Sequence, residues 1–159
     1  MTDAHRETLE RVFCDVVEKQ ACLFCSPMDP AELECPDEVL RATIEFQGPN
    51  RGRLTLMTPR SVAREVAAGV LGVDADDDAA DAAAADALGE LMNVASGQLV
   101  TELFSTVEVY EQSPPSVTAE ESTAGWSQLA GEAGTLAFDL ECEPVLLRLD
   151  MLDSPVPAS

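Results

Sequence analysis

Two kinds of hydrophobic pattern divide the chain into helices and strands. Apolar residues recur at helical spacing over residues 3–24, 59–71 and 79–104, which predicts three helices. Apolar and polar residues alternate over residues 39–46, 51–57, 106–110, 135–142 and 145–151, which predicts strands. The turn signal at 47–52 joins the first two strands into a hairpin. This order predicts an α+β domain, with helices packed on one face of a mostly antiparallel sheet.

The second predicted helix has recognisable ends and one apolar side. Thr58 or Ser61 can cap its N-terminus, and Gly72 can end it. The residues expected on its inner face are Val62, Val66, Val70 and Leu71. We expect this face to pack against the rest of the domain.

Prolines and small polar residues mark the connections between elements. Residues 26–30 contain two prolines and stop the first helix, and Ser113-Pro114-Pro115 breaks the strand before it. Residues 116–134 are rich in Ser, Thr, Glu, Ala and Gly, which predicts a loop with Trp126 tucked back as an anchor. Because the pattern shows neither a repeat nor a second boundary, we interpret 1–159 as a single domain.

An acidic run, Asp74-Ala75-Asp76-Asp77-Asp78, precedes the third predicted helix. Four acids in five residues are typical of a calcium loop, but the D-x-D-x-D-G order and the glutamate that follows it are missing. Aspartates also suit a helix N-terminus, where they accept hydrogen bonds from free backbone amides and complement the helix dipole. We therefore interpret this run as helix-capping.

Composition excludes several classes of function. The formal net charge of -21 argues against binding to nucleic acid or to an anionic membrane, because both require clustered Lys and Arg. No apolar run reaches the length of a membrane span, and the N-terminus lacks the apolar centre of a signal sequence. We therefore expect a cytoplasmic protein without membrane insertion. Adaptation to high salt is one origin of such acidity, and other acidic proteomes have the same composition.

The five cysteines are expected to be thiols in a reducing compartment. Cys22 and Cys25 have the C-x-x-C spacing, but no second pair or histidine completes a zinc ligand set, and no predicted strand precedes the motif as in thioredoxins. We interpret them as small buried side chains, with metal or redox chemistry as the alternative. His5, the only histidine, lies near a chain end without a nucleophile in view, so we expect it to be solvated.

The third predicted helix contains the most informative stretch. At about 100° per residue, one side of the helix is apolar and faces inward. The residues on this side are Leu88, Leu91, Met92, Ala95 and Leu99. The opposite side carries Asp86, Glu90, Asn93 and Gly97. Glu90 and Asn93 project side by side, and a glycine inside a good helix suggests close approach of another molecule to the backbone. This outer side is therefore a candidate docking face.

Several segments together resemble one protein family. Residues 52–56 read GRLTL, residues 70–72 read VLG, residues 86–97 read DALGELMNVASG, and residues 113–117 read SPPSV. In this order they resemble the CheX/CheC/FliY family of chemotaxis phosphatases. The resemblance implies a CheC/CheX-like fold and hydrolysis of the aspartyl phosphate on a CheY-type response regulator.

The resemblance also implies roles for individual residues. Asn93 would orient the attacking water, and Glu90 would pair with the active-site lysine of the regulator. Asp86 and Gly97 would contribute to partner binding. The chain would need no cofactor of its own, because the regulator would bring its aspartate, lysine and Mg²⁺. A site divided between two proteins suits the chemistry, since this hydrolysis needs a positioned water and charge neutralisation but little covalent catalysis.

The motif occurs once in this chain, which places it nearer the CheX branch than the CheC branch, where two helices carry it. Members of the CheX branch form dimers joined through their sheets, so a homodimer is implied, although nothing in this sequence independently requires one. Two alternatives stay open. One is a non-catalytic module of the same fold that docks a signalling or flagellar-switch partner, and the other is an unrelated scaffold domain.

Overall fold

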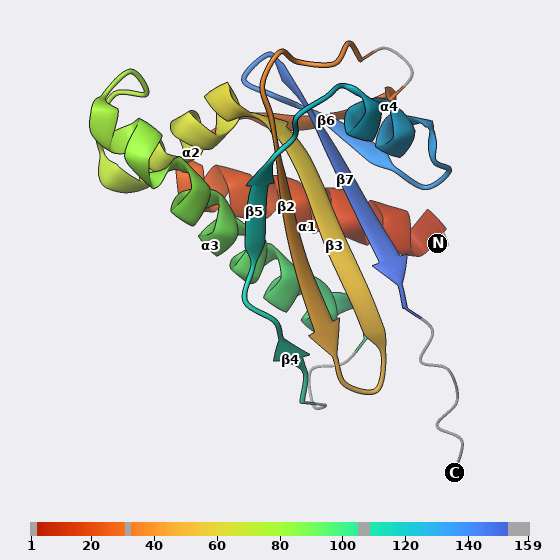
Figure 1. The fold of residues 1–159 in the computed structure, drawn as a ribbon. Coiled ribbons are helices and arrows are strands. Elements are labelled where there is room, and N and C mark those ends of the chain that lie inside the picture. The colour runs from red at the N-terminus through yellow and green to blue at the C-terminus, as the bar shows by residue number, and fades with distance from the viewer. Residues whose placement is uncertain (1–2, 31–32, 105–108, 153–159) are drawn as a thin grey trace.

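The computed structural model describes residues 3–30, 33–104 and 109–152 (Figure 1). Over these residues the chain forms a seven-stranded antiparallel sheet and four helices. The helices are α1 (Asp3–Ala21), α2 (Arg60–Leu71), α3 (Asp78–Leu103) and α4 (Ala124–Gly131). The strands are β1 (Cys25–Met28), β2 (Val39–Gln47), β3 (Arg51–Pro59), β4 (Glu111–Gln112), β5 (Ser116–Ala119), β6 (Leu136–Leu140) and β7 (Glu143–Met151).

The sheet has the strand order β1-β6-β7-β3-β2, and the short strands β4 and β5 both pair with the outer side of β2. The predicted hairpin is confirmed, with Val39 opposite Pro59 and Gln47 opposite Arg51. The two predicted C-terminal strands are confirmed as β6 and β7. The α+β class with a mostly antiparallel sheet is therefore confirmed.

The three long helices cover one face of the sheet (Figure 1). Alternate strand residues such as Ile44 and Leu56 point toward this layer and are almost fully buried. They pack with Phe13 of α1 and with Leu88 and Met92 of α3. The main core thus lies between the sheet and α1, α2 and α3, and it fixes which side of α3 faces inward.

A smaller core lies on the opposite face of the sheet. Trp126 and Leu129 of α4 pack there with Met57 and Leu146, whose side chains alternate with those of the main core. The prediction of a loop over 116–134 is wrong, because this segment contains β5 and α4. The prediction that Trp126 anchors the segment is confirmed, since 2% of its surface is exposed.

The structure also corrects the reading of residues 26–30. Part of this segment belongs to β1, where Pro27 lies opposite Phe138 of β6. Because β1 is an edge strand, a proline can turn its missing N–H away from the sheet without losing a ladder hydrogen bond. The prediction that these prolines stop the first helix is wrong as well, because α1 already ends at Ala21, where Cys22 takes a positive φ of 58°.

The start of α2 differs from the prediction. Pro59 is the N-cap residue, and no side chain caps this end, so the expected cap by Thr58 or Ser61 is wrong. The Arg60 N–H donates instead to the Glu38 carbonyl at 3.0 Å. The C-terminal prediction is confirmed, because Gly72 ends α2 in the left-handed conformation.

The prediction for the inner face of α2 is confirmed for two residues and wrong for the other two. Val62 and Val66 are buried, whereas Val70 and Leu71 are 58% and 49% exposed. Alanines take the inner positions in the second half of the helix, where Ala67 packs closely against α3. Small side chains let the two helices approach each other, so the larger residues lie outside.

The start of α3 agrees with the capping interpretation of the acidic run. Asp77 is the N-cap residue, and its side chain accepts a hydrogen bond from the Ala79 N–H at 2.9 Å. Within the described ranges, no group of His, Cys, Asp and Glu side chains is arranged to hold a metal ion. No helix in this part of the chain is long and apolar enough to cross a membrane.

Most of the strand expected at 106–110 lies outside the described residues, and Val109 and Tyr110 belong to no strand. The interpretation of the C-x-x-C cysteines as buried is wrong for Cys22, which is exposed, whereas Cys25 is half-buried.

Candidate docking site on helix α3

Helix α3 presents two chemically distinct sides. The side predicted to face inward is buried along its length, with Leu88, Met92 and Ala95 fully enclosed. On the other side Asp86 and Glu90 are exposed, while Asn93 and Gly97 are partly exposed. The predicted division of the helix is therefore confirmed. The four outer residues are called the outer row below.

Two polar side chains, those of Glu90 and Asn93, lie at the centre of the outer row. Within the described residues, the structure records no hydrogen bond to the Asn93 carboxamide and no ion pair for Glu90. Both sit on the rigid backbone of a 26-residue helix. Their backbone positions are therefore fixed, while their side chains remain available to a second molecule.

A neighbouring strand supports the helix backbone at this point. Gln112 of β4 donates a hydrogen bond from Nε2 to the Asn93 carbonyl oxygen at 3.2 Å. Gln112 itself is held in the sheet, where it lies opposite Phe46, and the next residue exchanges two hydrogen bonds with Glu45. Sequence reasoning missed Gln112, because its proximity to α3 depends on a long-range strand pairing that no local pattern reveals.

An aromatic cluster fixes the segment that carries Gln112. The rings of Phe46, Phe104 and Tyr110 lie with centroids 5.8 to 6.1 Å apart. The Tyr110 hydroxyl accepts a hydrogen bond from Asn50 at 3.1 Å. The cluster thus joins the C-terminal end of α3, the β2–β3 turn and β4 beside the outer row.

A shallow groove of about 490 Å³ runs along α3 from Asn93. Its lining residues are Asn93, Val94, Gly97, Gln98, Thr101 and Glu102. A Cβ atom added at Gly97 would lie 3.8 Å from the Gln112 side chain, which is an ordinary contact. The chain's own packing therefore does not require glycine at this position. That another molecule approaches the helix backbone at Gly97 therefore stays a prediction.

Gly89, in the same helix, contrasts with Gly97. A Cβ atom there would lie 3.2 Å from Pro115, which is closer than ordinary side-chain contacts. Gly89 is thus explained by the strand segment packed against it. Among the described residues, no neighbour comes comparably close to a Cβ atom at Gly97.

A cavity of about 960 Å³ lies elsewhere, at the start of α2. Two arginines line it, Arg60 and Arg64, and both form ion pairs with Asp81 at 3.3 and 3.4 Å. Acidic residues such as Asp37 and Glu143 line the same cavity. Because the charges are mixed and the arginines are already paired, this cavity suggests no specific ligand.

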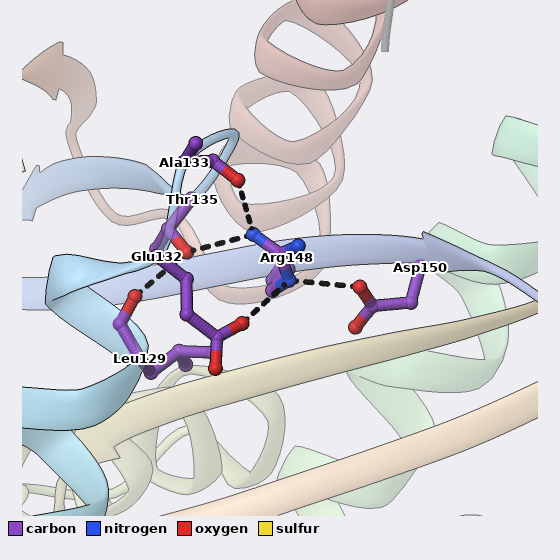
Figure 2. Close-up of polar contacts among 6 residues, drawn as sticks. All are labelled: Leu129, Glu132, Ala133, Thr135, Arg148 and Asp150. Atoms are coloured by element: carbon purple, nitrogen blue, oxygen red, sulfur yellow. Dashed lines mark hydrogen bonds and ion pairs between the residues drawn. The ribbon is translucent and has the colours of Figure 1, made fainter.

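A polar cluster on the C-terminal hairpin contrasts with the outer row (Figure 2). Arg148 Nε contacts Asp150 at 2.8 Å and Glu132 at 3.1 Å. Its Nη1 donates to the Ala133 carbonyl at 2.6 Å, and lies 3.3 Å from the Thr135 hydroxyl. These contacts join β7 to the connection between α4 and β6, so the cluster stabilises the fold.

One protein-family model matches most of the chain. A family model described as "Chemotaxis phosphatase CheX" matches residues 40–138. No curated protein matches the chain.

Solved structures of chemotaxis proteins share the fold. CheX from Desulfovibrio desulfuricans is 16% identical with a TM-score of 0.66, over 94% of this chain and 99% of its own. CheX from Vibrio vulnificus is 15% identical with a TM-score of 0.67, over 93% of this chain and 96% of its own. The CheX–CheY–BeF₃–Mg²⁺ complex from Borrelia burgdorferi matches at 15% identity and a TM-score of 0.66, over 94% and 98% of the respective chains.

Proposed function

Because the chain belongs to the CheX family of chemotaxis phosphatases, we propose that it hydrolyses the aspartyl phosphate of a CheY-type response regulator. The observation that carries this proposal is the outer row of α3, where Glu90 and Asn93 lie beside Gly97 without a partner among the residues that the structure describes. The Borrelia CheX that shares this fold forms a complex with CheY, BeF₃ and Mg²⁺. A response regulator is therefore the partner that we assign to the outer row.

Asn93 is the residue that we assign to the chemistry. In the reaction, a water oxygen forms a bond to phosphorus, and the bond from phosphorus to the aspartate oxygen breaks. A carboxamide carries both an acceptor and donors, so it can hold a water in line with the breaking bond. In GTPases a glutamine positions the attacking water in this way. Because the regulator supplies the phosphorylated aspartate and Mg²⁺, this chain needs no cofactor of its own.

Glu90 is the residue that we assign to partner recognition. It lies nearly one turn before Asn93 and is exposed, so its carboxylate can pair with a lysine beside the phosphorylated aspartate. Asp86, one turn earlier, extends the acidic side of the contact, and Gly97 lets the partner approach the helix backbone. The formal net charge of -21 would accelerate encounter with a basic partner surface.

We propose one such site on one domain, since the motif occurs once in the sequence. The homodimer implied by the family resemblance stays a prediction. The alternative function is that of a docking module of the same fold, which binds a signalling or flagellar-switch partner without hydrolysis. The experiment must distinguish this function from hydrolysis.

The test is phosphate release from phosphorylated CheY-type regulators of the same organism, with and without the protein. We expect the protein to accelerate phosphate loss and Asn93→Ala to slow it about 100-fold, the scale for removal of one transition-state hydrogen-bonding group. Binding to the regulator should change less than about threefold, because Asn93 acts mainly on the transition state. Gln20→Ala, which removes an exposed carboxamide from α1, is the matched control and should retain full activity.

Two results would contradict the proposal. If the protein bound a phosphorylated regulator without changing its rate of phosphate loss, the docking function would be correct. If Asn93→Ala and Gln20→Ala hydrolysed at the rate of the unmodified protein, another residue would carry the chemistry.

A further inference from the structure

Two cysteines that do not belong to the outer row lie in contact. Cys14 is on α1, and Cys25 is the first residue of the edge strand β1. Their sulfur atoms are 2.9 Å apart. Both side chains are half-buried and pack against the main core. The fold thus holds two thiols together across the junction between α1 and the sheet.

This pair differs from the one that the sequence spacing suggested. Cys22 follows the last residue of α1 with a positive φ of 58°, and it is exposed. In the described part of the chain, the structure records no contact between the sulfur atoms of Cys22 and Cys25. The sulfur atom of Cys25 therefore contacts Cys14, and not Cys22 of the C-x-x-C motif.

We propose that Cys14 and Cys25 form a reversible oxidation site, at which a peroxide converts the two thiols into a disulfide. The proposal is independent of the phosphatase function. It rests on the short distance between the sulfur atoms, and on their attachment to two elements that the core already holds side by side.

The reaction balances with hydrogen peroxide as the oxidant. The Cys14 thiolate attacks one peroxide oxygen, the O–O bond breaks, and a sulfenic acid and a hydroxide ion form. The hydroxide takes up the proton that the Cys14 thiol released and becomes the first water. The Cys25 sulfur then attacks the Cys14 sulfur, a disulfide forms, and the sulfenic oxygen leaves as a second water with the remaining thiol proton. Two thiols are oxidised by two electrons and one peroxide is reduced to two waters.

The surroundings favour Cys14 as the attacking residue. The hydrogen bond between the two sulfur atoms lowers the pKa of Cys14 and raises the pKa of Cys25. The thiolate is the reactive form of cysteine, so the first step falls to Cys14. Cys25 then acts as the resolving thiol.

The acidic surroundings also select the kind of oxidant. The negative charges of Glu18 and Asp15 partly offset the lowering of the Cys14 pKa, and the chain carries a formal net charge of -21. This negative field repels anionic disulfides such as oxidised glutathione. Hydrogen peroxide is neutral and small, so it can approach a half-buried pair.

The bond would tie α1 to the edge of the sheet. In the chain-entropy account, closing the loop between residues 14 and 25 lowers the unfolding equilibrium constant about 100-fold. Oxidised protein should therefore unfold at a higher urea concentration than reduced protein, and a reducing agent should reverse the difference.

The experiment treats the full chain at low concentration with hydrogen peroxide, alkylates the remaining thiols, and maps tryptic peptides. Cleavage after Arg11, Lys19 and Arg41 places Cys14 alone in peptide 12–19, and Cys25 in peptide 20–41. We expect these two peptides to be joined, with fragmentation assigning the bond to Cys25. Cys22→Ser should still form the link, whereas Cys25→Ser should abolish it.

Two outcomes would overturn the inference. One is a disulfide within peptide 20–41 that joins Cys22 to Cys25, as the spacing alone would suggest. The other is complete alkylation of all five cysteines under conditions that fully oxidise a control dithiol peptide. Because the readout is a covalent bond, failure here leaves the phosphatase proposal untouched, and the reverse also holds.

Discussion

The Arg148 cluster and the outer row of α3 show two ways of carrying polar side chains on one molecule. Around Arg148, the guanidinium contacts two carboxylates, a carbonyl and a hydroxyl, all within the chain (Figure 2). On α3, Glu90 and Asn93 have no such partners in the described residues. The first arrangement stabilises the fold, and the second leaves interactions for another molecule.

This difference teaches how to separate structural from functional polar residues. A group that is satisfied internally contributes to the free energy of unfolding when it is present and costs stability when it is removed. An exposed group without internal partners contributes little to stability, so a large effect of its removal must concern a partner. Substitutions in the two regions should therefore change different measured quantities.

The largest effect is expected for Asn93→Asp, which keeps the size of the side chain. The change removes the amide N–H donors and places a negative charge where the phosphoryl group would lie, so hydrolysis should fall by at least about 100-fold. The free energy of unfolding should change by less than about 0.5 kcal/mol, because the side chain is partly exposed. Phosphate release and urea unfolding measure the two quantities. If Asn93→Asp lowered the free energy of unfolding enough to explain the lost activity, Asn93 would be a structural residue. The distinction between the outer row and the Arg148 cluster would then fail.

The next effect is expected for Arg148→Met, and it concerns stability. The Arg148 side chain is 19% exposed, and its removal leaves Glu132 and Asp150 without their cation. We expect a loss of about 2 kcal/mol in the free energy of unfolding, measured by urea titration. Arg6→Met is the control, since its exposed pair with Glu10 contributes only about 0.3 kcal/mol. If Arg148→Met folded but no longer hydrolysed the aspartyl phosphate of the regulator, the assignment of Arg148 to stability alone would be wrong.

Glu90→Ala should weaken binding to the regulator about tenfold, the scale of a lost interfacial charge pair. Glu65→Ala removes the same charge from an exposed position on α2 and should leave the dissociation constant nearly unchanged. The difference between the two variants should shrink at high salt, because salt screens exposed charges. Equal weakening by both variants would mean that only the overall charge matters, and Glu90 would lose its assigned role.

The smallest effect is expected for Gly97→Ala, and it should have opposite signs for stability and binding. The new methyl group meets only an ordinary contact within the chain, so the helix should gain about 0.5–1 kcal/mol. Binding to the regulator should weaken severalfold, because the methyl group keeps the partner away from the helix backbone. Gly89→Ala is the contrasting control, since the close approach of Pro115 should offset the gain in helix propensity. Unchanged binding by Gly97→Ala would remove Gly97 from the interface.

The parts of the fold that follow local rules could be predicted from the sequence. The apolar stripe of α3, the alternation along β2 and β3, and the glycine at the end of α2 each depend on near neighbours in the chain. For the same reason, the orientation of Glu90 and Asn93 could be predicted, because it follows from the position of Leu88 and Met92 on the same helix. Their functional roles came from the family resemblance and stay proposals.

The parts that depend on distant contacts could not be predicted. The strand β5 alternates too weakly to be recognised, and it exists because it pairs with β2. Only Trp126 and Leu129 are buried in α4, and their spacing of three residues is a signal of helix that the small polar residues around them obscured. Val70 was expected inside because it is apolar, but the alanines of α2 already fill the contact with α3.

Two prolines separate β4 from β5. On the outer side of β2, these short strands form an edge that Pro114 and Pro115 interrupt, and neither proline has an N–H to offer. A neighbouring copy of the chain would find no continuous row of donors along which to add a strand. The sequence that holds Gln112 against α3 therefore also protects this border of the molecule from growing into an aggregate.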